Sequence, residues 1–335
     1  MTSSNQQTLL QVEDLSIRFK TYNGYLNAVN SISFKVNKGE VLALVGESGC
    51  GKSLTSLAIM GLIEKPGEVK AEKIQLNDKN LPKLKENEMR RLRGDRISMI
   101  FQEPLTSLNP LFRVGHQIDE VFRYHGGLSR SQAKEKSIEM IKKVGIARPE
   151  AVYNAYPVEL SGGMRQRIMI AMALACNPEL LIADEPTTAL DVTIQAQILQ
   201  LMRGLQQELQ TSIILITHDL GVVAEMADRV AVMYAGRIVE QTDVYTLFSK
   251  PLHPYTKGMI GSTLKLNEHI NNLPTIKGAV PSLSNMPNGC RFHPRCEYAT
   301  DKCSLQAPEL REVEPGHFVE CWNYEMIGVL EGETV

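Results

Sequence analysis

An α/β fold built on a mostly parallel sheet is predicted by two observations. Strand-length apolar runs (EVLALVG, RISMIFQ, ELLIADE, SIILITH and RVAVMY) alternate with helical patterns that begin at Lys52, at Val192 and after His218. This alternation is typical of parallel strands covered by helices. The chain has 335 residues, 43% hydrophobic and 22% charged. It is therefore long enough to bury a substantial core.

Three other regions surround this alternating pattern. LLQVEDLSIRF and AVNSISFKV resemble antiparallel strands joined by a turn at Asn23-Gly24, and KIQLNDKNL adds to the same small β-subdomain. Residues 103–176 contain charged, helix-favouring sequence, which predicts an inserted helical subdomain. From about residue 250 prolines recur and periodicity fades, which predicts an extended C-terminal appendage.

Composition and patterning exclude several classes of protein. The net charge is −2 and the basic residues are scattered, so nucleic-acid binding has no support. The first residues have no cationic segment followed by an apolar run, so neither a signal peptide nor a transit peptide is expected. No stretch approaches the roughly 18 apolar residues of a membrane span. We expect a cytoplasmic protein that reaches a membrane only through partners.

The segment GESGCGKS at 46–53 matches the phosphate-loop pattern G-x-x-x-x-G-K-[ST] between a strand and a helix. Backbone amides and the helix N-terminus would bind phosphate oxygens, Lys52 would reach the β- and γ-phosphates, and the Ser53 hydroxyl would ligate Mg²⁺. Cys50 is interpreted as a small filler rather than a nucleophile. The candidate ATP-binding residues here are Gly46, Glu47, Ser48, Gly49, Cys50, Gly51, Lys52, Ser53 and Leu54.

Two later strands end in polar residues suited to ATP hydrolysis. LLIADEP places Asp184 and Glu185 at a carboxyl edge, where ligands of such sheets bind. Asp184 would hold Mg²⁺ through water, and Glu185 would be the base that polarises the attacking water. SIILITHD ends in His218, which could reach the γ-phosphate and orient the water. These residues predict a Mg²⁺-dependent ATPase.

A further motif indicates the kind of ATPase. VELSGGMRQR places Ser161, Gly162 and Gly163 before a helix, where free amides suit a γ-phosphate. LSGGM resembles the signature motif of ABC ATPases, and the resemblance covers the whole chain. It implies a RecA-like core over 8–250 with the β-subdomain and the helical subdomain.

The same resemblance implies further site residues. Gln102 matches the glutamine that in the family touches Mg²⁺, the attacking water and the transmembrane partner. Asp191 matches the aspartate at the dimer seam. Phe19 matches the aromatic residue that stacks on adenine, with Tyr22 and Tyr25 as rivals.

The last part of the chain contains four cysteines, Cys290, Cys296, Cys303 and Cys321. In a cytosolic segment a metal site is favoured over disulfides. Because the spacing lacks C-x₂-C pairs, an iron–sulfur cluster is favoured over zinc or unliganded thiols. Residues 251–335 also resemble the C-terminal region of oligopeptide and dipeptide importer ATPases, as does FQEPLTSLNP. Cysteine-bearing members of that family are taken to carry a [4Fe-4S] cluster.

The resemblance also implies partner subunits and a subcellular location. Two cassettes would pair head to tail, here as a heterodimer with a second ABC ATPase, so that LSGGM of one closes over ATP held by the other. Two transmembrane permease subunits would bind the pair, and an extracytoplasmic substrate-binding protein would act indirectly. The chain would then be a peripheral protein on the cytoplasmic face of the cell membrane.

Alternatives stay open at this stage. Nickel, glycosides or another solute could replace peptides, because the motor never contacts cargo. A soluble ABC ATPase acting on ribosomes or DNA is disfavoured by the single cassette and by the lack of a heptad run. A small-molecule kinase would have no use for LSGGM.

Overall fold

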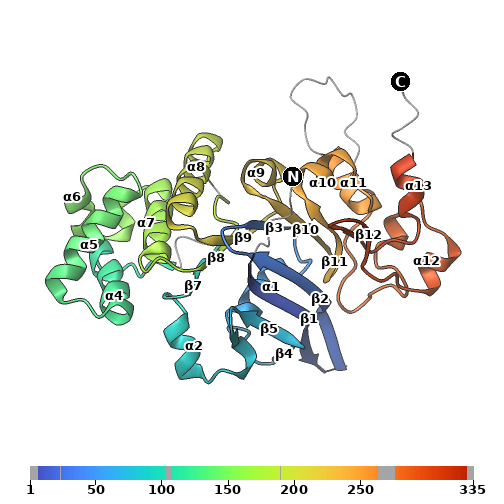
Figure 1. Cartoon of the computed structure of the whole chain (residues 1–335), viewed down its shortest axis with the longest axis horizontal. Helices are drawn as coiled ribbons and strands as arrows, with labels where there is room; N and C mark the ends of the chain where they lie inside the picture. Colours follow the sequence, from blue (N-terminus) through green and yellow to red (C-terminus); the bar gives the residue numbers. More distant parts are fainter. Residues whose placement is uncertain (1–6, 23, 103–106, 189, 263–275, 330–335) are drawn as a thin grey trace. The chain divides into compact units, whose positions relative to one another are not determined.

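The computed structural model describes residues 7–22, 24–102, 107–188, 190–262 and 276–329. The chain forms two compact units. Figure 1 labels the helices and strands of the whole chain. The first unit comprises Met1–Leu10, Val36–Val41 and Leu76–Ile216. The second comprises Gln11–Lys35, Leu42–Gln75 and Thr217–Val335.

The first unit contains parallel strands and a group of helices. Strand β8 (Leu180–Asp184) lies between β7 (Ile97–Ile100) and β9 (Ser212–Thr217) and is parallel to both. All five β8 side chains are buried, as expected for a strand covered on both faces. The remaining elements are β6 (Lys79–Asn80), η1 (Leu81–Lys83), α2 (Glu86–Leu92), α4 (Val114–Gly126), α5 (Arg130–Lys143), α6 (Pro149–Asn154), η2 (Pro157–Glu159), α7 (Gly162–Leu174) and α8 (Val192–Leu209).

Helices α4, α5, α6 and α7 gather into the helical subdomain, coloured green in Figure 1. A buried carboxylate joins three of them. Asp119 of α4 accepts hydrogen bonds from the Ser137 hydroxyl of α5 and the Tyr153 hydroxyl of α6, both 2.6 Å long. Desolvation is the largest cause, and the hydrogen bond to Asp119 the second, of a rise in the pKa of Tyr153 to about 12. The phenol therefore stays a donor at neutral pH.

The second unit contains two sheets and the helix that follows the phosphate loop. In one sheet β1 (Thr8–Thr21) lies between β2 (Gly24–Asn37) and β5 (Lys73–Leu76), and β4 (Gly67–Lys70) pairs antiparallel with β1. Of the expected turn, Asn23 lies outside the described residues, while Gly24 has φ 114°. In the other, β3 (Val41–Val45) is parallel to β10 (Arg229–Tyr234), which is antiparallel to β11 (Arg237–Asp243).

The C-terminal residues belong to this second unit. Strand β13 (His317–Val319) pairs with β11 and with β12 (Arg311–Glu314). The predicted appendage over 251–335 stays a prediction, and within it β12 and β13 add two short strands to the sheet of β3, β10 and β11. The other elements of the unit are α1 (Lys52–Ile59), α9 (Leu220–Met226), α10 (Val244–Ser249), α11 (Pro254–Gly261), η3 (His293–Arg295), α12 (Asp301–Leu305) and α13 (Tyr324–Val329).

One buried cluster explains why the C-terminal residues belong with the strands. Val45 of β3, Val232 and Tyr234 of β10, Tyr255 of α11 and Phe292 share a hydrophobic core. The Tyr234 and Tyr255 rings lie 4.7 Å apart between centroids. No helix among the described residues is long and apolar enough to cross a membrane.

His253 caps helix α11 and supplies a prediction on acid stability. Its Nδ1 accepts a hydrogen bond from the Tyr255 amide at 3.1 Å, and its own amide donates to Glu240. Complete burial lowers the pKa of His253 from 6.5 to about 4, although the nearby Glu240 carboxylate opposes the shift. The folded state therefore holds a neutral imidazole. As pH falls, His253 binds a proton in the unfolded chain at a higher pH than in the folded protein.

We expect His253 to contribute stability that is present above pH 6.5 and is lost as pH falls toward 4. The loss amounts to about 3 kcal/mol. A His253→Asn protein keeps a capping side chain but no titrating group. Urea unfolding at pH 7 and pH 5 should show a shallower pH dependence for this variant than for the parent. Equal slopes in the two proteins would contradict the assignment.

Candidate active site

The phosphate loop lies between β3 and α1, as the motif requires, and its glycines have structural reasons. Gly46 has φ 150°, and a Cβ on it would meet the Met233 carbonyl oxygen at 2.1 Å. Gly51 caps α1 at φ 105°, and a Cβ there would meet a Val29 methyl at 2.9 Å. Both positions therefore exclude side chains. The backbone curls into the conformation that presents amides to an anion.

Lys52 lies within this loop. Its side chain is buried, and Nζ donates to the carbonyl oxygens of Gly46 at 2.8 Å and Glu47 at 3.1 Å. The ammonium group is therefore held among the residues that would surround phosphate. The Cys50 thiol is buried, and desolvation raises its pKa. A buried thiol with a raised pKa is a weak nucleophile, and the filler role of Cys50 stays a prediction. Ser53 follows in the first turn of α1 and is half-buried.

The acidic pair lies at the carboxyl end of β8 in the first unit. Asp184 is the last residue of the strand and is buried. Glu185 follows with φ 47°, a left-handed conformation that is uncommon for a residue with a side chain. Its amide donates to the Ile216 carbonyl of β9 at 2.9 Å, which fixes the turn.

Two side chains hold the Glu185 carboxylate. Gln102 Nε2 donates to Glu185 Oε2 at 2.8 Å, and the Thr188 hydroxyl donates to the same oxygen at 2.9 Å. Gln102 follows β7, whose last residue pairs with Ala183. Parallel register therefore brings the predicted glutamine and base together. Thr188 was missed by sequence reasoning, although its place three residues after Glu185 in the EPTT turn was a usable indication.

His218 directly follows β9 and is exposed. It lies after a strand whose neighbour β8 ends in the acidic pair. An exposed strand-end histidine is accessible to a ligand, which is what the predicted role requires. The assignment of His218 to the γ-phosphate stays a prediction.

The signature segment and the D-loop position both act as helix caps. Ser161 caps α7, with its hydroxyl accepting from the Met164 amide at 3.3 Å, and it is exposed with Gly162. Gly163 lies against α8, since a Cβ on it would meet an Ile194 methyl at 2.9 Å. Asp191 caps α8 by accepting from the Ile194 amide at 2.9 Å. Helix capping explains why Ser161 and Asp191 occupy these two positions. Their contacts with a second cassette stay a prediction.

The candidate adenine-stacking residues differ in their surroundings. Phe19 is half-buried on β1 and lies against Gly67, whose Cβ would be 3.0 Å from the ring. Tyr25 donates to Glu68 and is covered by the Arg18 guanidinium 4.1 Å from its ring centroid, while Tyr22 is fully exposed. The stacking role of Phe19 stays a prediction.

Two C-terminal residues that sequence reasoning did not single out contact the phosphate loop. The Glu47 amide donates to the Tyr255 hydroxyl at 2.8 Å. The Glu47 carboxylate forms an ion pair with Arg295 at 3.1 Å. Both residues lie within 251–335, the part that resembles the C-terminal region of importer ATPases, but nothing in a linear pattern indicates contacts over such sequence separations.

The four C-terminal cysteines line one small cavity, together with His253, Phe292 and Trp322 among others. Burial raises the pKa of Cys290 to about 11 and of Cys321 to about 12, and their neighbouring cysteines add to both shifts. As they lie, no group of three or more His, Cys, Asp or Glu side chains among the described residues could hold a metal ion. The donor set nevertheless fits a Cys₄-ligated group in composition, because four thiols meet at one cavity.

The α/β fold, the phosphate loop with Lys52, and the Glu185 carboxylate with its donor Gln102 define a phosphate-loop ATPase of the ATP-binding cassette class. The family model described as "ABC transporter" matches residues 29–188. The model described as "Oligopeptide/dipeptide transporter, C-terminal region" matches residues 239–303. The chain belongs to the ABC transporter ATP-binding family, in its oligopeptide/dipeptide branch.

Relatives and solved structures agree with this membership. The oligopeptide transport ATP-binding protein AppD of Bacillus subtilis is 52% identical, over 96% of this chain and 98% of its own. The dipeptide transport ATP-binding protein DppD of Escherichia coli is 48% identical, over 93% and 96%. A solved dimer of an ATP-binding cassette bound to ADP and phosphate is similar with TM-score 0.62 and 27% identity, over 70% of this chain and 99% of its own.

Proposed function

We propose that this chain is the ATP-hydrolysing motor of an ABC importer for di- or oligopeptides. The observation that carries the proposal is the combination, in one family member, of a phosphate loop with Lys52 in place and a Glu185 carboxylate held by Gln102. Peptides are the proposed cargo because AppD and DppD, which this chain resembles over more than nine-tenths of its length, are an oligopeptide and a dipeptide transport ATP-binding protein.

In the proposed reaction each residue has a separate task. The phosphates are bound by Lys52 and by the backbone amides of residues 46–54, except the Glu47 amide, which donates to the Tyr255 hydroxyl. Ser53, Gln102 and Asp184 would hold Mg²⁺, and the bound ion would supply positive charge next to the phosphates. Glu185 accepts a proton from the attacking water while Gln102 and Thr188 fix its orientation. His218 orients the γ-phosphate and the water, and Phe19 stacks on adenine.

The proposed assembly has two cassettes. Ser161, Gly162 and Gly163 of one cassette would close over ATP held by the phosphate loop of the other, with Asp191 at the seam. Exposure of Ser161 and Gly162 at the start of α7 supports this role, because a helix N-terminus is a favourable place for a phosphate. We favour a heterodimer with a second ABC ATPase, bound to two permease subunits on the cytoplasmic face of the membrane and served by an extracytoplasmic binding protein.

An uptake assay tests the cargo. A strain lacking this chain should fail to accumulate labelled di- and tripeptides. The parent gene should restore uptake, whereas a Glu185→Gln gene should not. Loss of nickel or glycoside uptake with unchanged peptide uptake would favour the alternative cargoes. Unchanged uptake of all these solutes would favour a soluble ABC ATPase.

We also propose that Cys290, Cys296, Cys303 and Cys321 ligate a [4Fe-4S] cluster. The support is that four separate sequence positions line one cavity, together with Trp322. Thiols with raised pKa values must lose protons to bind metal, so loading should release protons and should depend on pH.

Metal analysis after anaerobic purification tests the cluster. We expect about four iron and four sulfide per chain and a brown colour. The Cys290→Ser protein should lose the iron, the sulfide and the colour. The Cys176→Ser protein, which changes a cysteine that does not line the cavity, should keep all three. Zinc in place of iron would identify a zinc site, and absence of metal from the parent protein would remove the proposal.

A further inference from the structure

The C-terminal segment around η3 contacts the second residue of the phosphate loop. Arg295 Nη1 lies 3.1 Å and 3.2 Å from the two carboxylate oxygens of Glu47. The Arg295 side chain is 7% exposed and that of Glu47 is 33% exposed. This pair is therefore not an ordinary surface ion pair, whose contribution would be small.

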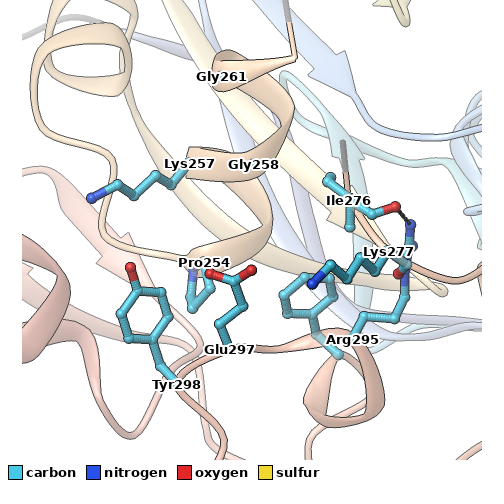
Figure 2. Close-up of a pocket in the computed structure, with 10 residues that line it drawn as sticks. Pro254, Lys257, Gly258, Gly261, Ile276, Lys277, Arg295, Glu297 and Tyr298 are labelled. Atoms are coloured by element: carbon cyan, nitrogen blue, oxygen red, sulfur yellow. Dashed lines mark hydrogen bonds between the residues drawn. The ribbon is translucent and has the colours of Figure 1, made fainter. Parts of the chain in front are cut away.

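Arg295 is fixed by other groups and not only by Glu47. Its Nε donates to the Lys277 carbonyl at 2.9 Å, and Nη2 lies 3.4 Å from the carbonyls of Ile276 and Gly278. Figure 2 shows Arg295 at the edge of a pocket, bonded to Ile276 across from α11. Because the guanidinium is planar, bonds on its Nε and Nη2 edges orient the remaining Nη1 toward Glu47.

Tyr255 holds the backbone of the same loop residue. Its hydroxyl oxygen accepts a 2.8 Å hydrogen bond from the Glu47 amide. Its ring is fully buried against Tyr234 and Phe292. That amide is therefore committed to Tyr255 and not to a phosphate oxygen. Main chain and side chain of Glu47 are both held by C-terminal residues.

The far side of the loop is connected to the same segment. The Gly236 amide donates to the Cys50 carbonyl at 2.9 Å, and Arg291 donates to the carbonyl of Ala235, the preceding residue. Arg291 thus holds the residue next to Gly236, while Arg295, four residues later in the chain, holds Glu47.

We propose that Arg295 is a positioning residue for nucleotide binding, which acts by holding Glu47 and with it the start of the phosphate loop. The ligand is ATP at the loop, so the inference rests on the proposed ATPase function. Phosphate affinity depends on amides preorganised before the nucleotide arrives. Loss of Arg295 leaves the chemistry at Glu185 in place and frees the loop to sample other conformations.

Three variants and a control test this role. Arg295→Met and Glu47→Gln each remove the ion pair, and the double variant removes both partners. Arg237→Met is the matched control, because Arg237 pairs with the buried Glu320 at 2.9 Å in the same unit and does not touch the loop. The measurements are the Kd of a fluorescent ATP analogue with Mg²⁺, kcat and KM for ATP, and Tm without nucleotide.

We expect Arg295→Met to raise Kd and KM by about 10-fold, which corresponds to about 1.4 kcal/mol, with kcat within about twofold of the parent. The double variant should be no weaker than Arg295→Met, since both changes break one interaction. Arg237→Met should lower Tm and leave Kd unchanged. If Arg295→Met does not fold, Glu47→Gln carries the test.

Other outcomes overturn the proposal. A parent-like Kd with a lowered Tm would make Arg295 a structural residue only, and additive losses in the double variant would separate it from Glu47. A parent protein that binds no ATP would refute the proposed function itself, a result that the first titration distinguishes from failure of the positioning role.

Discussion

A Glu185→Gln protein is expected to bind ATP as the parent does and to hydrolyse it at least about 100-fold more slowly. The amide has the shape of the carboxylate but cannot accept a proton from water. The structure places this carboxylate on a left-handed residue at the end of β8, with Gln102 and Thr188 both donating to Oε2. Neither donor requires a charge at Glu185, so the substitution should preserve the local fold.

Phosphate release and ATP-analogue binding on the same preparation separate the two effects. Glu179→Gln is the control, because Glu179 lies just before β8, at the opposite end of the strand, and bonds to Arg96 and Asn77. It should keep normal turnover. Parent-like hydrolysis by Glu185→Gln would refute the assignment of Glu185 as base, whereas loss of binding would show that the carboxylate organises the nucleotide site.

Removal of the phosphate-loop lysine should have the second large effect. Lys52→Ala is expected to weaken ATP binding at least about 100-fold, since charge-assisted hydrogen bonds to phosphates are lost. The Lys52 ammonium lies against the Gly46 and Glu47 carbonyls, inside the curl of the loop. Its loss removes positive charge from that place and also leaves two carbonyls without their donor.

Equilibrium titration with an ATP analogue measures this change, and Tm without nucleotide shows whether the loop still folds. Lys73→Ala is the control. Lys73 of β5 belongs to the same unit, and its ammonium group donates a hydrogen bond to Gln11 of β1. It should bind ATP normally. An affinity for Lys52→Ala within about threefold of the parent would overturn the phosphate-loop assignment.

The sequence was sufficient for the features that depend on local chemistry. The phosphate loop, the acidic end of β8 and the Ser161 cap each lie within a few consecutive residues, and glycine, serine and carboxylate side chains have strong local preferences. The alternation of apolar runs likewise indicated the α/β class and the parallel strands β7, β8 and β9. Family resemblance added Gln102, whose bond to Glu185 the structure then showed.

Only the tertiary structure decided which distant residues meet. Glu47 contacts Tyr255 and Arg295, which are separated from it by 208 and 248 positions along the chain. Strand β13 joins β11, and four dispersed cysteines share a cavity. Such contacts depend on strand register and on the packing of Tyr234, Tyr255 and Phe292, and no local pattern encodes them. The sequence alone determined a nucleotide-binding loop, whereas packing decided that C-terminal residues hold it.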